Sequence, residues 1–275
     1  MEMRYRNAGQ LGGGKARLTI AVIVAIFSFL AYWLNTSKNP ITGESQRIAG
    51  ITVQNEIELG LQARDQVAAQ FGGFEPDPGA NALVDKIGTE LVASLKADSI
   101  PWKFEFHVLD DPKTINAFAL PGGQIFITEG LMRQLDTEGQ LAGVLGHEIG
   151  HVIERHGAQQ MAKAKLSQGM TAAAVVASGD YRSGQLAQVV AGLINMKYGR
   201  ADELESDRWG IRLMGGSGYD PRAIIGVMEV LKKAGGGKSQ PEFFSTHPNP
   251  ENRIRRIKDE IEKTFPGGVP SGLKG

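Results

Sequence analysis

Two histidines and a glutamate near the middle of the chain have the spacing of a metal site. His147 and His151 are four residues apart, and Glu148 directly follows the first. On a helix, residues four apart project from one face, so both imidazoles can bind a single tetrahedral zinc ion. Glu148 is too far round to complete that coordination but can reach a zinc-bound water. In this H-E-x-x-H arrangement the metal acidifies the water and the glutamate takes its proton.

The surrounding residues predict a buried helix. Segment 137–156 starts with Thr137, a suitable N-cap. Its apolar face has the histidine pair at its edge and consists of Leu141, Val144, Leu145, Ile149, Val152 and Ile153. Gly143, Gly146 and Gly150 form a stripe beside the histidines. Because a glycine inside a helix costs about 1 kcal/mol relative to alanine, we expect another backbone or a substrate strand to pack there. Structural histidines without metal are the alternative.

A catalytic zinc ion needs a third protein ligand and one open position. Cysteine is absent, so thiolate ligands are excluded. In metzincins the third ligand is a histidine six residues after the second motif histidine, and a glycine stands three residues after it. Those places hold Gly157 and Glu154 here. His156 is one residue off, and on a continuous helix it points elsewhere. The sequence therefore disfavours the metzincin pattern.

An acidic cluster at 201–210 offers the other solution. Glu203 and Asp207 are four residues apart and share a helix face, so one can bind the metal while the other orients a ligand imidazole. Spacing alone leaves Asp202 and Glu205 as alternatives to Glu203. It also leaves the plainer interpretation, a solvated acidic helix face.

Helical periodicity and alternation define the elements that position these residues. Periodic apolar residues predict packing helices over 53–70 and 81–96, and alternation predicts strands over 102–108, 115–120 and 124–128. Residues 121–123, Pro-Gly-Gly, separate the last two strands as a turn.

The rest of the chain is expected to be helical. The apolar stretches 171–178 and 187–196 are too short to cross a bilayer and are expected as core or groove-lining helices. Two later helices are predicted at 221–233 and 250–264, the second with Asn249 as N-cap and Pro250 as its first residue.

The N-terminal region predicts a membrane anchor. Seventeen uncharged residues run from Leu18 to Leu34, enough to span most of a roughly 30 Å hydrocarbon layer. The basic residues before them are Arg4, Arg6, Lys15 and Arg17. By the positive-inside rule the N-terminus lies in the cytoplasm and the rest outside, which is the periplasm in a bacterium. A cleaved signal peptide is the main alternative, but the run is long for one and no A-x-A-like site follows.

Composition bounds the remaining possibilities. Thirty basic and thirty acidic side chains cancel among 275 residues, which argues against a nucleic-acid partner. We expect a cytoplasmic tail at 1–17, a transmembrane anchor at 18–36, a linker at 37–50 and one zinc metallopeptidase domain at 51–275.

With these residues in place, the chain resembles the superfamily of HtpX, Oma-type and CAAX-prenyl zinc metallopeptidases. The matching segments are NAFALPGGQIFIT (116–128), HEIGHVIERH (147–156), ELESD (203–207) and THPNPENR (246–253). The resemblance implies a mainly helical α+β, zincin-like fold with a small antiparallel sheet. It places the third ligand of one zinc ion on Glu203, and on Asp207 the acid that orients a ligand.

The resemblance also implies roles for residues outside the metal motif. The strand of Gly123, Gln124, Ile125 and Phe126 is expected to be an active-site edge to which an extended substrate adds. His247 is expected near the metal, to stabilise the oxyanion or to cap the open metal position, with Arg253 beside it.

Together these features predict a membrane-anchored zinc metalloendopeptidase in the inner membrane that cleaves unfolded or misassembled proteins in envelope quality control. Ser206 and Gly199 depart from the common pattern without touching the ligands. The multiple spans of HtpX and the prenyl proteases are missing, which favours the small, single-span branch. The alternatives are a zinc-stabilised chaperone or binding module without cleavage, and an anchor protein without metal.

Overall fold

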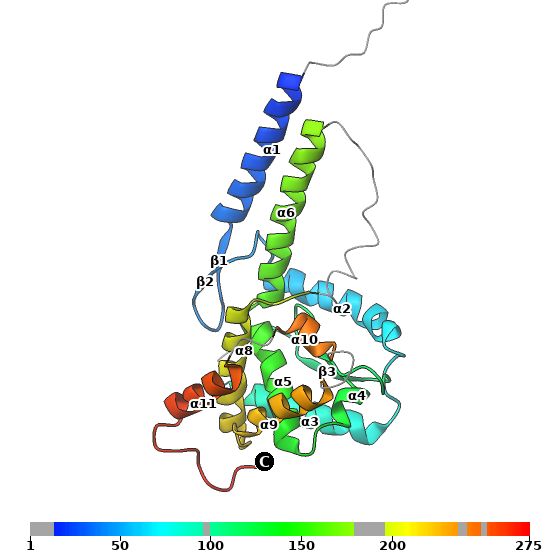
Figure 1. Cartoon of the computed structure of the whole chain (residues 1–275), viewed down its shortest axis with the longest axis vertical. Coiled ribbons are helices and arrows are strands. Elements are labelled where there is room, and N and C mark those ends of the chain that lie inside the picture. The colour runs from blue at the N-terminus through cyan, green and yellow to red at the C-terminus, as the bar shows by residue number, and fades with distance from the viewer. Residues whose placement is uncertain (1–13, 96–99, 179–195, 236–240, 249–251) are drawn as a thin grey trace, which may run out of the picture.

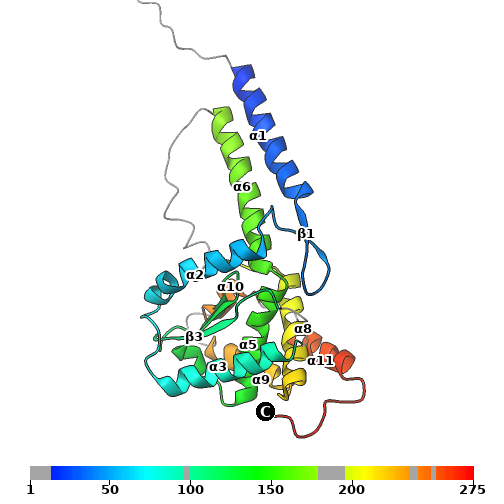
Figure 2. The same ribbon diagram turned by 180° about the vertical axis from the view of Figure 1, so that it is seen from behind.

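The computed structural model describes residues 14–95, 100–178, 196–235, 241–248 and 252–275. Two long helices, α1 (Gly14–Leu34) and α6 (His156–Ser178), project side by side from a domain that holds the remaining elements (Figures 1 and 2). The mainly helical fold with a small sheet and one apolar N-terminal helix, as predicted, is confirmed.

The domain's helices match the sequence periodicity closely. They are α2 (Val53–Gln70), α3 (Pro78–Ala93), α4 (Glu129–Met132), α5 (Glu138–Ile153), α8 (Arg200–Ser217), α9 (Ala223–Ala234), α10 (Phe243–Thr246) and α11 (Arg253–Thr264). Thr137 caps α5 as predicted, since its side chain accepts a hydrogen bond from the backbone N–H of Gln140. The expected cap Asn249 lies outside the described residues. Helix α11 begins at Arg253, three residues later than predicted.

The larger sheet is mixed rather than antiparallel, which corrects the expectation. Its strands are β3 (Glu105–Leu109), β4 (Ala117–Ala119) and β5 (Gln124–Thr128), in the order β3-β5-β4. The tight turn at 121–123 makes β4 and β5 an antiparallel pair, whereas β3 pairs in parallel with the far side of β5. Strand β5 therefore lies in the centre of the sheet.

The segment expected as a linker contains a second, two-stranded sheet. Strands β1 (Thr36–Lys38) and β2 (Ser45–Arg47) pair in antiparallel fashion. Between them, the buried Asn39 donates a hydrogen bond from Nδ2 to the backbone oxygen of Ile153 at 2.6 Å, and Gln46 donates to that of Glu154 at 2.8 Å. The hairpin thus satisfies carbonyls that the end of α5 leaves unpaired.

Helix α5 is the centre of the core, and α8 packs tightly along it. A Cβ at Gly150 would lie 2.8 Å from the Cα of Ser206, and one at Gly146 would lie 3.1 Å from the Cα of Gly210. These distances confirm the close backbone approach that the glycine stripe predicts. The third glycine, Gly143, faces Ile224 of α9.

The apolar stretch 171–178 does not join the domain core, which corrects a second expectation. It forms the outer end of α6, beside α1 (Figure 1). The stretch is small and uncharged, and its described buried residue Ala173 fits that position because α1 is its neighbour there. Most of stretch 187–196 lies outside the described residues.

Candidate active site

Three donor side chains from two helices meet in the core. The Nε2 atoms of His147 and His151, one turn apart on α5, are 3.1 Å from each other. Glu203 enters from α8, and its two carboxylate oxygens divide between these nitrogens: Oε2 lies 3.5 Å from Nε2 of His147, and Oε1 lies 3.5 Å from Nε2 of His151. All three side chains are buried. The close packing of α8 against the α5 glycines brings Glu203 within this range.

The separations fit a tetrahedral metal site. With metal–donor distances of 2.0–2.1 Å, two ligands of a tetrahedral zinc ion stand about 3.3 Å apart. The two imidazole nitrogens and the carboxylate converge on one point in a buried site, which is the arrangement that a bound cation would complete. The donors therefore fit a zinc ion, which His147, His151 and Glu203 would hold. A fourth side chain, His247, also offers a ligand atom, and all four atoms lie within 4.8 Å of one another.

Glu148 lies beside these donors with both carboxylate oxygens buried. Neither oxygen has a hydrogen-bond partner within the described part of the chain. Burial raises the pKa of this carboxyl group, because the charged form loses its hydration. Buried polar atoms are normally paired, so the two oxygens indicate that water or substrate belongs next to them.

Asp207 and Arg253 hold the first histidine in place. The Nδ1 atom of His147 lies 2.9 Å from Oδ1 of Asp207, and Arg253 donates to both Asp207 oxygens at 2.8 Å. Arg253 also lies 3.0 Å from Glu203. With Nε2 free of a proton for a metal, Nδ1 carries the hydrogen and donates it to Asp207. The structure thus brings Asp207, the residue expected to orient a ligand, together with Arg253, which was expected beside His247.

In the absence of a metal, the pKa values of His147 and Glu203 are shifted in opposite directions. Burial disfavours the charged form of His147, but hydrogen bonds to Asp207 and Glu203 outweigh it and raise the pKa of this imidazole to about 9. Burial also opposes the charge on Glu203, yet His247 and His147 lower its pKa well below the usual value. Glu203 is therefore a carboxylate, which is the form that binds a cation.

His156 supports the second histidine, a role that the sequence analysis missed. Its Nδ1 atom lies 3.0 Å from Nδ1 of His151, and its Nε2 atom lies 3.1 Å from Oε2 of Glu205. If His151 offers Nε2 to a metal, its Nδ1–H donates to His156, and the Nε2–H of His156 donates to Glu205. Every proton in this chain has an acceptor. Arg155, with φ 56°, breaks the helix and turns His156 back toward the site.

His247 covers the remaining side of the donor cluster. It follows α10 and is fully buried, and its ring stacks on Phe243 with 4.4 Å between centroids. Its Nδ1 atom lies 3.1 Å from Glu203 and 3.4 Å from Nε2 of His147. Its Nε2 atom is 3.6 Å from Glu148. The structure therefore places His247 beside His147 and Glu203.

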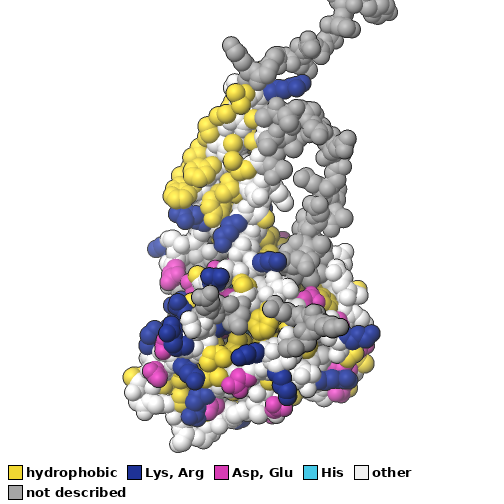
Figure 3. All heavy atoms as spheres, in the orientation of Figure 1, with side chains coloured by type: hydrophobic (Ala, Val, Ile, Leu, Met, Phe, Trp, Pro, Cys, Tyr) yellow, Lys and Arg dark blue, Asp and Glu magenta, His cyan; other side chains and the backbone are white. Residues whose placement is uncertain are grey.

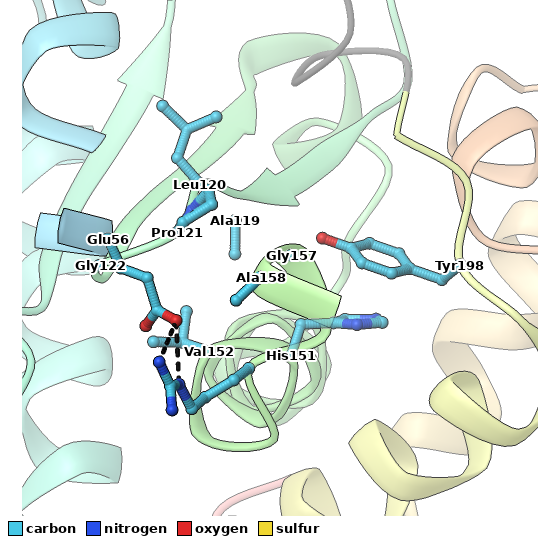
Figure 4. Close-up of a pocket in the computed structure, with 11 residues that line it drawn as sticks. Glu56, Ala119, Leu120, Pro121, Gly122, His151, Val152, Gly157, Ala158 and Tyr198 are labelled. Carbon is cyan, nitrogen blue, oxygen red and sulfur yellow. Dashed lines mark hydrogen bonds and ion pairs between the residues drawn. The ribbon is translucent and has the colours of Figure 1, made fainter. Parts of the chain in front are cut away.

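A small pocket lies next to the second histidine (Figure 4). Its walls come from α2, the end of α5, the start of α6 and the turn after β4. The rings of His151 and Tyr198 stack at this pocket, with 3.9 Å between their centroids. On its other side a buried ion pair joins Arg155 to Glu56 at 2.8 Å. Glu56 also accepts a hydrogen bond from Trp102. The pair fixes α2 to the end of the histidine helix.

The strand expected to be a substrate edge is not at the edge of the sheet. Gly123, Gln124, Ile125 and Phe126 belong to β5 or its entry, and β5 is paired on both sides. Strand β4 has one partner among the described strands. On either side of β4, Leu120 bonds to Gln124 and Asn116 bonds to Thr128 through the backbone. Hydrogen-bonded residues alternate along an antiparallel pair, so the backbone N–H and C=O groups of Ala117 and Ala119 point away from β5. Ala119 lines the pocket beside His151.

A buried helix with two histidines, an adjacent glutamate and a carboxylate from a second helix defines the metallopeptidase class. Residues 78–261 match the model of peptidase family M48, and the chain belongs to that family.

Several relatives are peptidases. The chain is 31% identical over 239 residues to the beta-barrel assembly-enhancing protease of Escherichia coli. The aligned region covers 81% of this chain and 48% of that protein. It is 31% identical to the mitochondrial metalloendopeptidase OMA1 of Schizosaccharomyces pombe, over 83% of this chain and 67% of that one. It is 30% identical to the metalloprotease YcaL of E. coli, over 82% of this chain and 94% of that protein. The chain thus spans about half the length of the first relative.

Proposed function

We propose that this chain is a zinc endopeptidase anchored in a membrane by α1, which cleaves unfolded or misassembled proteins on the far side from the cytoplasm. The observation that carries the proposal is the convergence of His147, His151 and Glu203 on donor distances of 3.1–3.5 Å, with the two unpaired oxygens of Glu148 beside them. The peptidase relatives support a protein substrate, and the bacterial one is named for enhancing beta-barrel assembly, which supports misassembled proteins as the substrate class.

The residues divide the work of hydrolysis. A zinc ion held by His147, His151 and Glu203 would polarise the scissile carbonyl and lower the pKa of the attacking water. Glu148 accepts the proton of that water and returns it to the leaving amine nitrogen. Burial raises the pKa of Glu148, which suits a group that must take up and release a proton. Asp207 and Arg253 keep His147 in the tautomer that presents Nε2.

The outer edge of β4 is the proposed substrate site. An extended peptide adding there would pair with the outward backbone groups of Ala117 and Ala119. Main-chain pairing depends little on side chains, which suits an enzyme that meets many unfolded sequences. The peptide would then run past the pocket that His151 and Tyr198 line.

His247 gives the site a closed state in this proposal. Its Nδ1 atom stands among the ligand donors, where it covers the direction that water and substrate need. Withdrawal of the α10 segment would open that direction. The enzyme is therefore expected to have low basal activity.

The membrane part of the proposal stands on α1. Residues Ala16–Leu34 are apolar enough and long enough to cross a bilayer, and 6% of their most apolar window is buried. The family match starts at residue 78, so this helix is supported by its own composition and not by the family. The basic residues before it favour a cytoplasmic N-terminus.

The test combines metal content with cleavage. The purified full-length protein is expected to contain close to one zinc ion and to cleave unfolded casein slowly. Glu148→Gln should keep the zinc and lose cleavage by 100-fold or more, on the order expected for a general base. Glu203→Ala should lose both. Glu262→Gln, an exposed glutamate on α11, is the matched control. Zinc with unchanged cleavage in Glu148→Gln would remove Glu148 from the mechanism, and zinc without cleavage in the wild type would favour a binding module.

A further inference from the structure

Almost all of the large exposed apolar side chains in the described chain lie on one helix. Apart from Leu61, Phe74 and Met170, they all belong to α1. They include Phe27 and Leu34, which are 72% and 70% exposed. In Figure 3 hydrophobic side chains form a column above the domain, whose own surface in this view mixes charged, polar and apolar side chains. A column of this kind is stable in hydrocarbon and not in water.

Helix α6 shares this column through close contact with α1. A Cβ at Gly169 would lie 2.2 Å from Oγ of Ser28, so the two backbones approach closely at that point. Ala21 of α1 and Ala173 of α6 are buried in the same contact region. Small residues on both sides are typical of helix pairs inside membranes. The stretch of α6 from Leu166 to Ser178 carries no charge.

Basic side chains stand at both ends of the apolar column (Figure 3). At the domain end, Lys163 and Lys165 are exposed on α6, and the guanidinium of Arg47 lies 4.1 Å from the ring centre of Trp33. At the other end Arg17 is exposed on α1. Basic residues and tryptophan at the boundaries of an apolar segment mark the level of lipid headgroups.

The contact between the two helices fixes how deep α6 reaches. Ser28 lies six residues before the end of α1, about 9 Å along the helix. Gly169 is at the same depth, and α6 continues for nine residues, or about 13 Å, to Ser178. Lys163 lies six residues before Gly169, which places it about 9 Å closer to the domain along α6 and level with Leu34 at the end of α1. An α1 that spans the bilayer therefore carries the uncharged part of α6 into the hydrocarbon.

We propose that Leu166–Ser178 of α6 is inserted in the bilayer beside α1, so that two helices hold the enzyme and not one. The partner of this surface is lipid acyl chains. The inference rests on the proposed membrane anchor and extends it. Helix α6 follows α5 after only Glu154 and Arg155, so the inserted segment is joined directly to the helix that carries His147 and His151.

The absence of cysteine allows a direct test. Single cysteines replace Met170 on α6, Phe27 on α1 and Lys232 on α9, all of which are exposed. Each full-length variant is labelled with the environment-sensitive dye NBD and reconstituted into phosphatidylcholine and phosphatidylglycerol vesicles. Lipids with a nitroxide in mid-chain are then added as quenchers. We expect Met170→Cys and Phe27→Cys to be quenched several-fold more than Lys232→Cys.

The outcomes separate the two proposals. Quenching at Phe27→Cys without quenching at Met170→Cys overturns the inserted α6 and leaves the α1 anchor. A blue-shifted but unquenched dye at Met170→Cys overturns it too, because protein and not lipid then covers the helix. Quenching at neither site removes the anchor as well. Casein cleavage by the same vesicles reports the peptidase activity independently of all three results.

Discussion

The Nδ1 atom of His156 lies 3.0 Å from Nδ1 of His151, and its other nitrogen reaches Glu205. The second histidine of the proposed metal site therefore has its own supporting hydrogen bonds, as His147 has Asp207. In both cases the ring nitrogen remote from the metal is fixed by a hydrogen bond, which sets the tautomer that a metal needs.

Replacing His156 with alanine is expected to weaken zinc binding about 10–100-fold, the usual cost of losing a group that orients a metal ligand. The loss arises because the Nδ1–H of His151 is left buried without an acceptor. Titration of the apo protein with zinc against a competing chelator measures it. His107→Ala, at a histidine that bonds Gln124 in the sheet, is the control. Equal affinity of His156→Ala and wild type would assign His156 to packing alone.

Gly150→Ala is expected to separate α5 from α8. The new Cβ would stand 2.8 Å from the Cα of Ser206, and backbone cannot rotate away as a side chain can. The cost should be about 1–3 kcal/mol in the free energy of unfolding, with weaker zinc binding because Glu203 moves with α8. Urea unfolding and zinc titration measure the two effects. In Gly226→Ala the added methyl meets only the end of the Gln140 side chain, so a small effect is expected.

His247→Ala should raise the basal cleavage of casein several-fold. The substitution removes the ring that stands 3.1 Å from Glu203 and 3.4 Å from His147, so water and substrate gain access to the donors. Zinc content should stay near one per chain. A fall in kcat of tenfold or more with unchanged zinc would instead show that His247 stabilises the transition state.

The buried pair of Glu56 and Arg155 leads to a prediction about stability. Arg155→Met leaves Glu56 buried with only Trp102 as a partner, and breaking a buried pair in this way costs about 3–5 kcal/mol. Urea unfolding of Arg155→Met and of the double variant Glu56→Leu with Arg155→Met checks it. The double variant should recover part of the loss. No difference from wild type in the single variant would show that the pair contributes no net stability.

Much of the site was predictable because its signals are local. His147, Glu148 and His151 lie on one helix whose periodicity, cap and glycine stripe are visible in the sequence. Glu203 needed the family pattern, since spacing alone did not separate it from Asp202 and Glu205. The structure places Glu205 on His156 instead, a link between two helices that no local pattern contains.

The errors come from features set by distant parts of the chain. Strand β5 was expected at an edge, but strand order depends on where β3 pairs, and β3 precedes β4 in the sequence. His156 was expected to point away because a continuous helix would turn it so. The left-handed backbone conformation at Arg155 interrupts the helix and turns the side chain of His156 toward His151.

The hairpin that joins α1 to the domain has a mechanical consequence. Asn39 comes five residues after Leu34 and already holds the last turn of α5 through Ile153. The proposed metal site is thus tethered closely to α1, and it cannot move tens of ångströms away from whatever holds that helix. If that support is a bilayer, chains that are stalled at its surface are within range of the enzyme, and chains free in the surrounding fluid must first come to it.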